Sequence, residues 1–201
     1  AEPDAEAHCD ADAEADGGSI SLLVGYGLQD ASASVTNSNE AQVGEGAVVH
    51  ADATGSDVTV RADTRNNAEA TATGASGSAV DISDSRVTAN VTDTTTTSVA
   101  AGADLRAADV LTVDAVSTVD VNTDAEVDNG GIGADASTSS SVTTKGTTST
   151  KIGDADLRAA AVLISARVAG VEIDSEADSS ASALGSDSDA VSTVDTESTA
   201  G

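Results

Sequence analysis

A serine-type hydrolase needs a histidine as its general base, and this sequence offers only His8 and His50. His8 lies in a segment of acidic residues and alanines. His50 stands between Val49 and Ala51, where a related segment further along the chain has Arg106, which indicates a side chain that faces solvent. No nucleophile, acid–base pair or cofactor motif accompanies either histidine. We therefore expect a protein that is not an enzyme, with no catalytic and no cofactor-binding residue.

Metal binding would have to rely on oxygen ligands, because the adjacent pair His8 and Cys9 is too small for a zinc site. Residues 130–135 read Gly-Gly-Ile-Gly-Ala-Asp, which matches the start of a calcium-binding nonapeptide and makes Asp135 a candidate ligand. The motif occurs once and Ser137 replaces the expected apolar residue, so a plain turn is favoured. We predict no firm metal site and leave calcium open. A weak site for divalent cations is conceivable at four further acids: Asp10, Asp12, Glu14 and Asp16.

Cys9 is the single cysteine, so no disulfide can form within the chain. A disulfide between two chains through Cys9 is one interpretation. The other is that this thiol has no role. The second interpretation is favoured.

The charge and the composition exclude several classes of partner. The 8 Lys and Arg residues face 35 Asp and Glu residues, which gives a formal net charge of −27. Phosphate groups would repel such a chain, so we exclude nucleic acid. No segment approaches the roughly 18–20 consecutive apolar residues of a membrane-spanning helix. With no Phe, no Trp and one Tyr, the chain lacks the aromatic residues that usually line ligand pockets and fill cores.

Composition alone is typical of disorder, because Val, Leu and Ile make up 37 of 201 residues, below the usual threshold of about 20%. The residue order predicts the opposite. Between residues 113 and 127 every acid occupies an even position, whereas residues 58–72 carry their charges at odd positions. A period of two over about 15 residues predicts long strands with one face of small residues and one solvated face.

An internal repeat organises these strands. The hexapeptide Ala103–Ala108 returns unchanged at Ala155–Ala160, which is 155 − 103 = 52 residues later, and repeats of this length are typical of stacked architectures. We expect an acidic flexible arm over residues 1–18, followed by a single β-repeat domain over residues 19–201. Its units of about 52 residues span approximately 51–102, 103–154 and 155–201.

The predicted fold class is all-β. Small side chains bury little area, so we expect complete backbone pairing and close approach of sheets, as in a repeat β-solenoid with extended hairpins. One such hairpin would join residues 110–127 to 134–152. At Ala169 and Gly170 the alternation of apolar and polar residues shifts by one position, which predicts a β-bulge. The alternative is a narrow β-sandwich of long antiparallel strands.

Several segments resemble the low-aromatic repeat regions of filamentous-haemagglutinin and leukotoxin-type bacterial surface adhesins. They are Leu23–Gly27, the alternating residues Ala31–Asn37, the Val-Gly-Glu turn at Val43–Glu45 with its counterpart Ile152–Asp154, and the Asp-Val-Thr-Val strand at Asp57–Val60. The turn at Ala101–Ala103 departs from this pattern because it lacks the acid. The resemblance covers most of residues 19–200, and it implies a secreted or cell-surface, non-catalytic role in a fibre.

These observations predict a structural protein of the cell surface that forms or decorates an extracellular filament or adhesin. Its partner would be itself, either as a homopolymer or through neighbouring repeats of a longer chain. The most apolar stretch, with Ile20, Leu22 and Val24, would pair with a sheet edge of its own repeats or of another chain by strand addition.

The threonine-rich segments predict an alternative function, an ice-binding or calcium-binding surface β-solenoid. Threonine is also a common strand residue on exposed faces, and this plainer interpretation is favoured. A flat, regular array of threonines in the folded protein would support the alternative. The residues concerned are Thr92, Thr94, Thr96, Thr143, Thr144, Thr147, Thr148 and Thr150.

Overall fold

The folded structure consists of long strands. The computed structural model describes residues 4–201, and this part of the chain forms strands and no helix, which confirms the predicted all-β class. The strands are β1 (Asp4–Ile20), β2 (Val24–Val43), β3 (Val48–Ala51), β4 (Val58–Val99), β5 (Asp104–Ala107), β6 (Val110–Ile152), β7 (Asp156–Arg158), β8 (Ala161–Ser182) and β9 (Gly185–Ala200).

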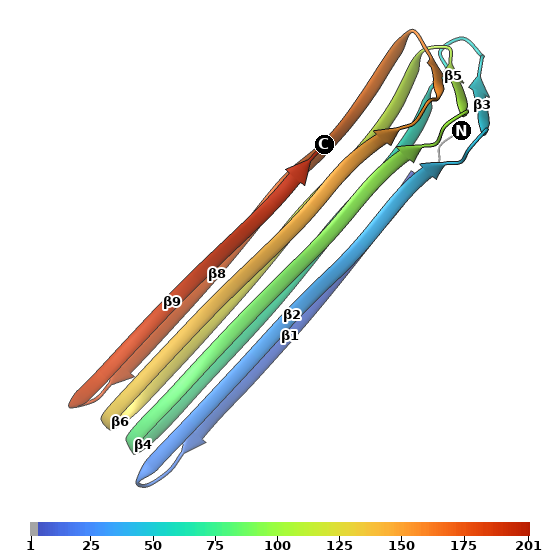
Figure 1. Cartoon of the computed structure of the whole chain (residues 1–201). Coiled ribbons are helices and arrows are strands. Elements are labelled where there is room, and N and C mark those ends of the chain that lie inside the picture. Colours follow the sequence, from blue (N-terminus) through green and yellow to red (C-terminus); the bar gives the residue numbers. More distant parts are fainter. Residues whose placement is uncertain (1–3) are drawn as a thin grey trace.

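The strand pairs are parallel and join segments about one repeat apart. β1 and β2 pair with the two halves of β4, β4 pairs along its length with β6, and β6 pairs with β8 and β9. The short strands β3, β5 and β7 form a separate sheet, in which the hexapeptide repeat places Leu105 beside Leu157. Figure 1 shows the chain running along one layer, turning, and returning along the other before it passes through the short sheet.

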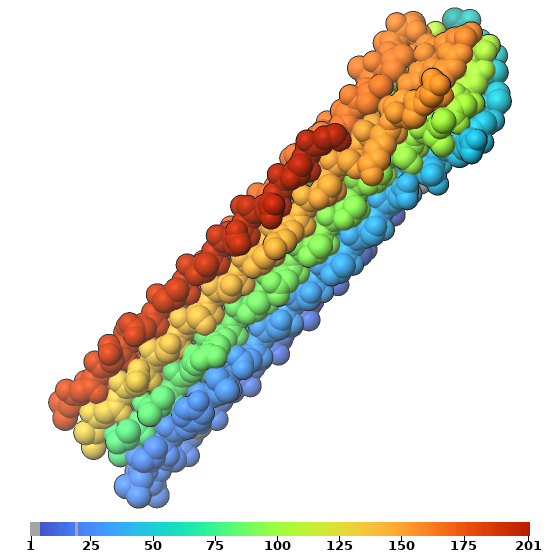
Figure 2. Space-filling model, in the orientation of Figure 1, coloured from blue at the N-terminus to red at the C-terminus, as the bar shows by residue number. Residues whose placement is uncertain are grey.

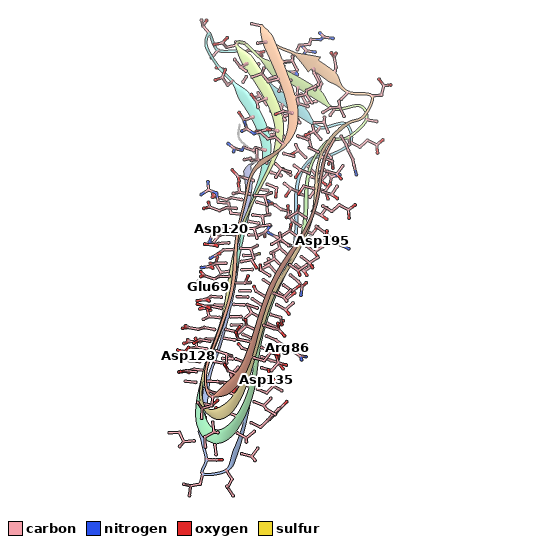
Figure 3. The ribbon with its side chains drawn as sticks, turned by 90° about the vertical axis from the view of Figure 1, so that its left-hand side faces the viewer. Glu69, Arg86, Asp120, Asp128, Asp135 and Asp195 are labelled. Atoms are coloured by element: carbon pink, nitrogen blue, oxygen red, sulfur yellow. The ribbon has the colours of Figure 1, made fainter. Side chains whose placement is uncertain are left out.

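β4 and β6 each bend near their middle, so that their two halves face each other across a narrow interior. Near these bends the pairing of β4 with β6 is interrupted at Ala79 and Ile132. Alternate residues of β4 are buried along most of its length. A hydrogen bond of 3.2 Å from the Ala62 amide to the Thr97 hydroxyl joins the two layers. Figure 3 shows side chains of both layers filling the space between the ribbons.

Small aliphatic side chains form the core in two clusters. One follows the long layers and contains Val87, Val121 and Val142 with many alanines. The other lies at the end with the short sheet and contains Leu105 and Leu111, which have no exposed surface. Short side chains let the two layers approach closely, and close packing supplies dispersion contacts that aromatic residues would otherwise provide. This packing explains how a chain without Phe or Trp can fold.

The acidic N-terminal segment is a strand, so the prediction of a flexible arm is wrong for residues 4–18. These residues belong to β1, which pairs in parallel with residues 61–77 of β4. The alanines that alternate with the acids explain the difference. Ala11, Ala13 and Ala15 pack against the core cluster while the acids face solvent. Residues 1–3 lie outside the described part of the chain.

The predicted antiparallel hairpin is also wrong. Residues 110–127 do not pair with residues 134–152; both segments belong to β6, and they pair in parallel with β4 on one side and with β8 and β9 on the other. The sequence pattern of a hairpin and of two facing layers joined by a bend is the same, because both alternate with a period of two. The predicted bulge is confirmed, because the register of β6 with β8 shifts between Ser117 and Thr118, where Ala169 has no partner.

Two adjacent glycines at the bend of β6 provide a matched test of its geometry. A Cβ at Gly131 would lie 2.1 Å from the Ser78 carbonyl oxygen, whereas a Cβ at Gly130 would meet nothing within 4 Å. We expect Gly131→Ala to destabilise the fold by roughly 2 kcal/mol, because backbone atoms must move, and to lower Tm by about 4–8 °C. Gly130→Ala should change Tm by less than about 2 °C. Equal shifts in a calorimetric scan would contradict the bend described here.

Candidate functional site: open edges and an acidic face

The sheets end in open edges on opposite sides of the molecule. Among the described residues, β1 and β2 pair only with β4, and β8 and β9 pair only with β6. In Figure 2 the blue and the red strands form these two outer borders along most of the molecule. Each border therefore presents a long row of backbone groups without a strand partner, and such a row is a template for pairing with another strand.

The core is left partly open at both edges. Ala68 and Ala70 in β4 have no exposed surface, but Ala11 and Ala13, which lie beside them in β1, are only half-buried. At the other edge Ile173 of β8 is likewise half-buried against the core cluster. A further layer of strands would complete the burial of these small residues, and burial of apolar area is favourable.

The residues predicted to mediate self-association lie at one end of the first edge. Ile20, Leu22 and Val24 are 94%, 95% and 64% exposed, at the bend between β1 and β2 in the blue part of Figure 1. Leu23 and Tyr26, 76% and 66% exposed, extend this group. Contiguous exposed apolar residues are typical of interaction sites. Their role in self-association stays a prediction.

The outer face of the layer formed by β1, β8 and the first halves of β4 and β6 is acidic. Because the strands pair in register, carboxylates stand side by side on neighbouring strands: Asp12 beside Glu69, Asp120 beside Glu172, Asp124 beside Glu176, and Glu126 beside Asp178. Glu69, Asp120 and Asp128 are labelled on this face in Figure 3. Like charges directly opposite each other destabilise a sheet, so the backbone and core must outweigh this repulsion.

The structure does not gather the four candidate metal ligands of β1 into a site. Asp10, Asp12, Glu14 and Asp16 are exposed and point outward one after another along the strand. In the described part of the chain, no group of three or more His, Cys, Asp or Glu side chains has an arrangement that could hold a metal ion.

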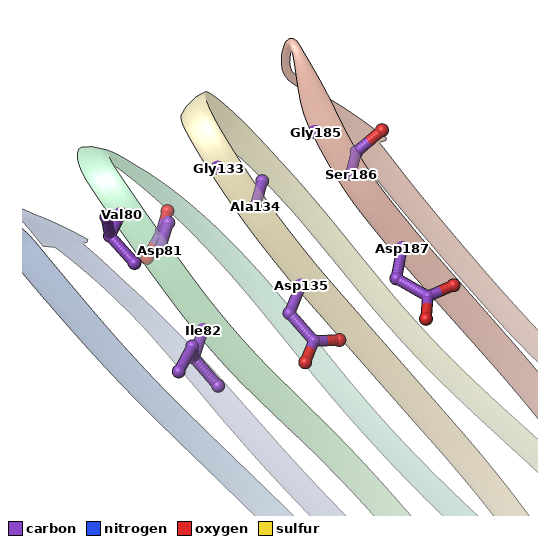
Figure 4. A pocket seen from close by; sticks show the side chains of 9 residues that line it. All are labelled: Val80, Asp81, Ile82, Gly133, Ala134, Asp135, Gly185, Ser186 and Asp187. Atoms are coloured by element: carbon purple, nitrogen blue, oxygen red, sulfur yellow. The ribbon is translucent and has the colours of Figure 1, made fainter.

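Asp135 belongs to a strand near the bend of β6, between Ile82 of β4 and Asp187 of β9. These residues border a shallow hollow (Figure 4), and Asp135 and Asp187 both project from the outer surface there. Asp135 lies in a continuous parallel ladder, and calcium binding by this residue stays a prediction.

Cys9 faces the interior side of β1 and is half-buried beside Asn66. It lies at an open edge rather than in a flexible arm. A disulfide between chains through this thiol stays a prediction.

His50 belongs to the short sheet and lies beside Arg106, as the alignment of the repeats predicts. Its Nε2 atom is 3.1 Å from Asp104 Oδ2, and Arg106 donates two hydrogen bonds of 2.9 and 2.7 Å to the same carboxylate. The hydrogen bonds from Arg106, and secondarily that from His50, hold the pKa of Asp104 below its usual value. His50 thus contacts a carboxylate that an arginine already neutralises, and His8 contacts Asp10 on the outer face.

The other layer presents hydroxyl groups on its outer face. Four residues on neighbouring strands form one row, Ser38, Thr94, Thr147 and Thr199. Thr92 and Thr96 flank Thr94 on the same face. The predicted threonine set divides between the two faces, because Thr144 and Thr148 are buried and the Thr150 hydroxyl donates across the interior to the Ser165 carbonyl at 2.5 Å.

Comparisons with known proteins provide no family for this chain. No protein-family model matches it, and neither does any curated protein or any solved structure. None of the described residues belongs to a helix of the length and apolarity that could cross a membrane.

Proposed function

We propose that this protein is a β-solenoid that serves as a non-catalytic structural module of an extracellular, cell-surface fibre or adhesin, and that copies of it stack head to tail. The observation that carries this proposal is the pair of open edges. β1 and β2 at one border and β8 and β9 at the other expose strands of 17, 20, 22 and 16 residues. In this interpretation each flattened coil consists of two long layers and one short strand.

The two borders are compatible with each other. If a second copy continues the parallel ladders, Ile173 of β8 comes to lie beside Ala11 of the next copy's β1, since both belong to one ladder through Ala68 and Val121. Other interior residues of β1 and β8 that would meet in this way are small, such as Ala13 with Ser175 and Ala15 with Ala177, so they can pack without loss of strand spacing. A head-to-tail contact does not close on itself, and it generates filaments. In a longer chain, further repeats would occupy the same edges.

The direct test is assembly of the purified chain in 1 M NaCl, followed by sedimentation velocity and electron microscopy. We expect filaments in which copies add along the direction of strand pairing. Ala13→Lys places a charge on the inner side of the edge strand β1, a device that blocks edge pairing in natural sheets, and should leave monomers whose circular dichroism is unchanged. Thr88→Lys, on the outer face of β4, is the control and should still assemble. Assembly of both variants to the same extent would contradict stacking through the edges.

The hydroxyl-rich face supports a second candidate function, binding to ice. The row from Ser38 to Thr199 repeats at the strand spacing of about 4.8 Å, so its hydroxyl groups form a regular array. Lys145 and Glu197 interrupt the neighbouring row, so the structural role is the favoured proposal. Thermal hysteresis that Thr94→Lys abolishes would support ice binding, and no hysteresis in the unmodified protein would exclude it.

A further inference from the structure

A polar cluster lies inside the bend of β4, where the remainder of the interior is mostly aliphatic or hydroxylic. It consists of Ser76, Asp81 and Ser83 of β4 and Asn129 of β6. Asp81 has no exposed surface, Ser83 and Asn129 are 3% and 4% exposed, and Ser76 is half-buried. The other three side chains converge on the Ser76 hydroxyl oxygen, which contacts Asp81 Oδ2, Ser83 Oγ at 2.8 Å and Asn129 Oδ1 at 2.8 Å.

These contacts need more hydrogens than the side chains possess. Ser76 and Ser83 supply one hydroxyl hydrogen each, whereas three oxygen–oxygen contacts must be satisfied. Asn129 cannot help, because its Nδ2 group donates to the Asp135 carbonyl at 2.6 Å, and turning the amide over would bring two carbonyl oxygens together. With the Asp81 carboxyl ionised, one pair of oxygens therefore meets without a hydrogen between them.

The charge of Asp81 is also unbalanced. Its Oδ1 atom is buried without a hydrogen-bond partner, and no Lys, Arg or His of the described chain forms an ion pair with it. Burying a carboxylate without a partner is very unfavourable. Nearby, the Oε1 atom of Gln29 is likewise buried without a partner. It rests against Gly74, where a Cβ would approach it to 2.5 Å.

Asp93 provides a comparison within the same interior. It is 2% exposed, and its Oδ2 atom contacts Ser117 Oγ at 2.6 Å and Thr95 Oγ1 at 3.1 Å, while Thr95 contacts Thr64 at 2.8 Å. Every partner in this group is a hydroxyl group, and Thr95 is the donor in both of its contacts. The Oδ1 atom of Asp93 is also buried without a partner. The cluster around Ser76 differs because the Asn129 amide oxygen, which can only accept, takes part in it.

We infer that Asp81, Ser76, Ser83 and Asn129 bind one hard cation inside the bend, with Gln29 as a neighbouring oxygen donor. Carboxylate, hydroxyl and amide oxygens are the ligands that calcium prefers, and sodium accepts the same donors. A cation removes both difficulties at once, because it balances the carboxylate and, by coordinating the oxygens, offsets the repulsion between them. The donors come from β4 and β6, with Gln29 from β2, so the bound ion would tie neighbouring layers together at the bend.

The test measures thermal unfolding of the monomeric chain after removal of metal ions by a chelator. CaCl2 and NaCl are compared with N-methylglucamine chloride at equal ionic strength. At about a hundredfold excess over the dissociation constant, we expect calcium or sodium to raise Tm by roughly 5–10 °C. Asp81→Asn should abolish this rise, and Asp93→Asn, which removes a buried carboxylate elsewhere in the interior, should retain it.

Each outcome decides the matter. A rise with sodium alone or with calcium alone identifies the ion and supports the site. Cation binding by the acids of the outer face raises Tm equally in all variants. A rise in Tm that persists in Asp81→Asn therefore overturns the proposal. No rise in the unmodified protein also overturns it, and would indicate an internal water molecule instead. If Asp81→Asn does not fold, Ser83→Ala removes one ligand and keeps the charge, and it should shift the midpoint of the cation titration to higher concentration.

Discussion

Replacing Asp12 and Glu14 by lysine is expected to strengthen head-to-tail assembly about thirtyfold in 0.1 M salt. In a continued ladder, Asp12 meets Asp174 of the preceding copy and Glu14 meets Glu176, because each pair belongs to one column of the acidic face. Unit charges about 5 Å apart in water interact by about 0.8 kcal/mol. Turning two repulsions into two attractions therefore changes association by about 3 kcal/mol, or about 2 kcal/mol after screening.

Sedimentation equilibrium over a range of salt concentrations measures this effect. The unmodified protein should assemble only at high salt, whereas the double variant should assemble at low salt and weaken as salt is added. Glu69→Lys combined with Asp120→Lys is the matched control. It changes the net charge equally, but both residues lie one strand away from an edge, so its effect should be several times smaller. Equal effects of the two double variants would contradict the proposed register.

Replacing Val87 by aspartate is expected to destabilise the fold severely. Val87 is 1% exposed and belongs to the core cluster between the two layers, and no cationic side chain of the described core is part of that cluster. An unpaired carboxylate at this position should cost about 4 kcal/mol or more, which is a large part of the roughly 5–15 kcal/mol that stabilises an ordinary domain.

Urea unfolding followed by far-ultraviolet circular dichroism provides the measurement. The adjacent variant Thr88→Asp carries the same new charge on the outer face, where Ser32 and Ser141 are its neighbours on the adjacent strands. The free energy of unfolding of this variant should differ from that of the unmodified protein by no more than about 0.5 kcal/mol, as for an ordinary surface substitution. If Val87→Asp unfolds at the same urea concentration as Thr88→Asp, the assignment of the inner face is wrong.

The candidate site could be predicted from the sequence only where it depends on one strand. The outward direction of Asp10, Asp12 and Glu14 follows from alternation with alanine, and the register of His50 with Arg106 follows from the repeat. The columns of facing acids and the cluster around Ser76 could not be predicted. The columns of acids and the contact of Ser76 with Asn129 bring together residues about 50 positions apart in the chain, and a difference of a single residue in the repeat length would move each side chain to the opposite face.

The N-terminal strand β1 also depends on a contact with a distant segment of the chain. Seven acids in residues 1–18 indicate a solvated arm when they are counted alone, yet β1 forms because β4 offers it a complete ladder of backbone partners and a groove for its alanines. A neighbouring strand is not part of the local sequence, so local composition cannot include the free energy of pairing with it.

Apart from β1, the sequence by itself determined the strands, their buried and solvated faces, the bulge near Gly170 and the repeat of about 52 residues, because these depend on the alternation of side chains along one extended backbone. Only the tertiary structure decided that the strands pair in parallel, that two edges remain open, and that Asp81 is buried among oxygens. The physical reason is that pairing direction, edges and enclosed polar groups are properties of contacts between distant segments, and an alternating pattern is equally compatible with a hairpin and with two stacked layers.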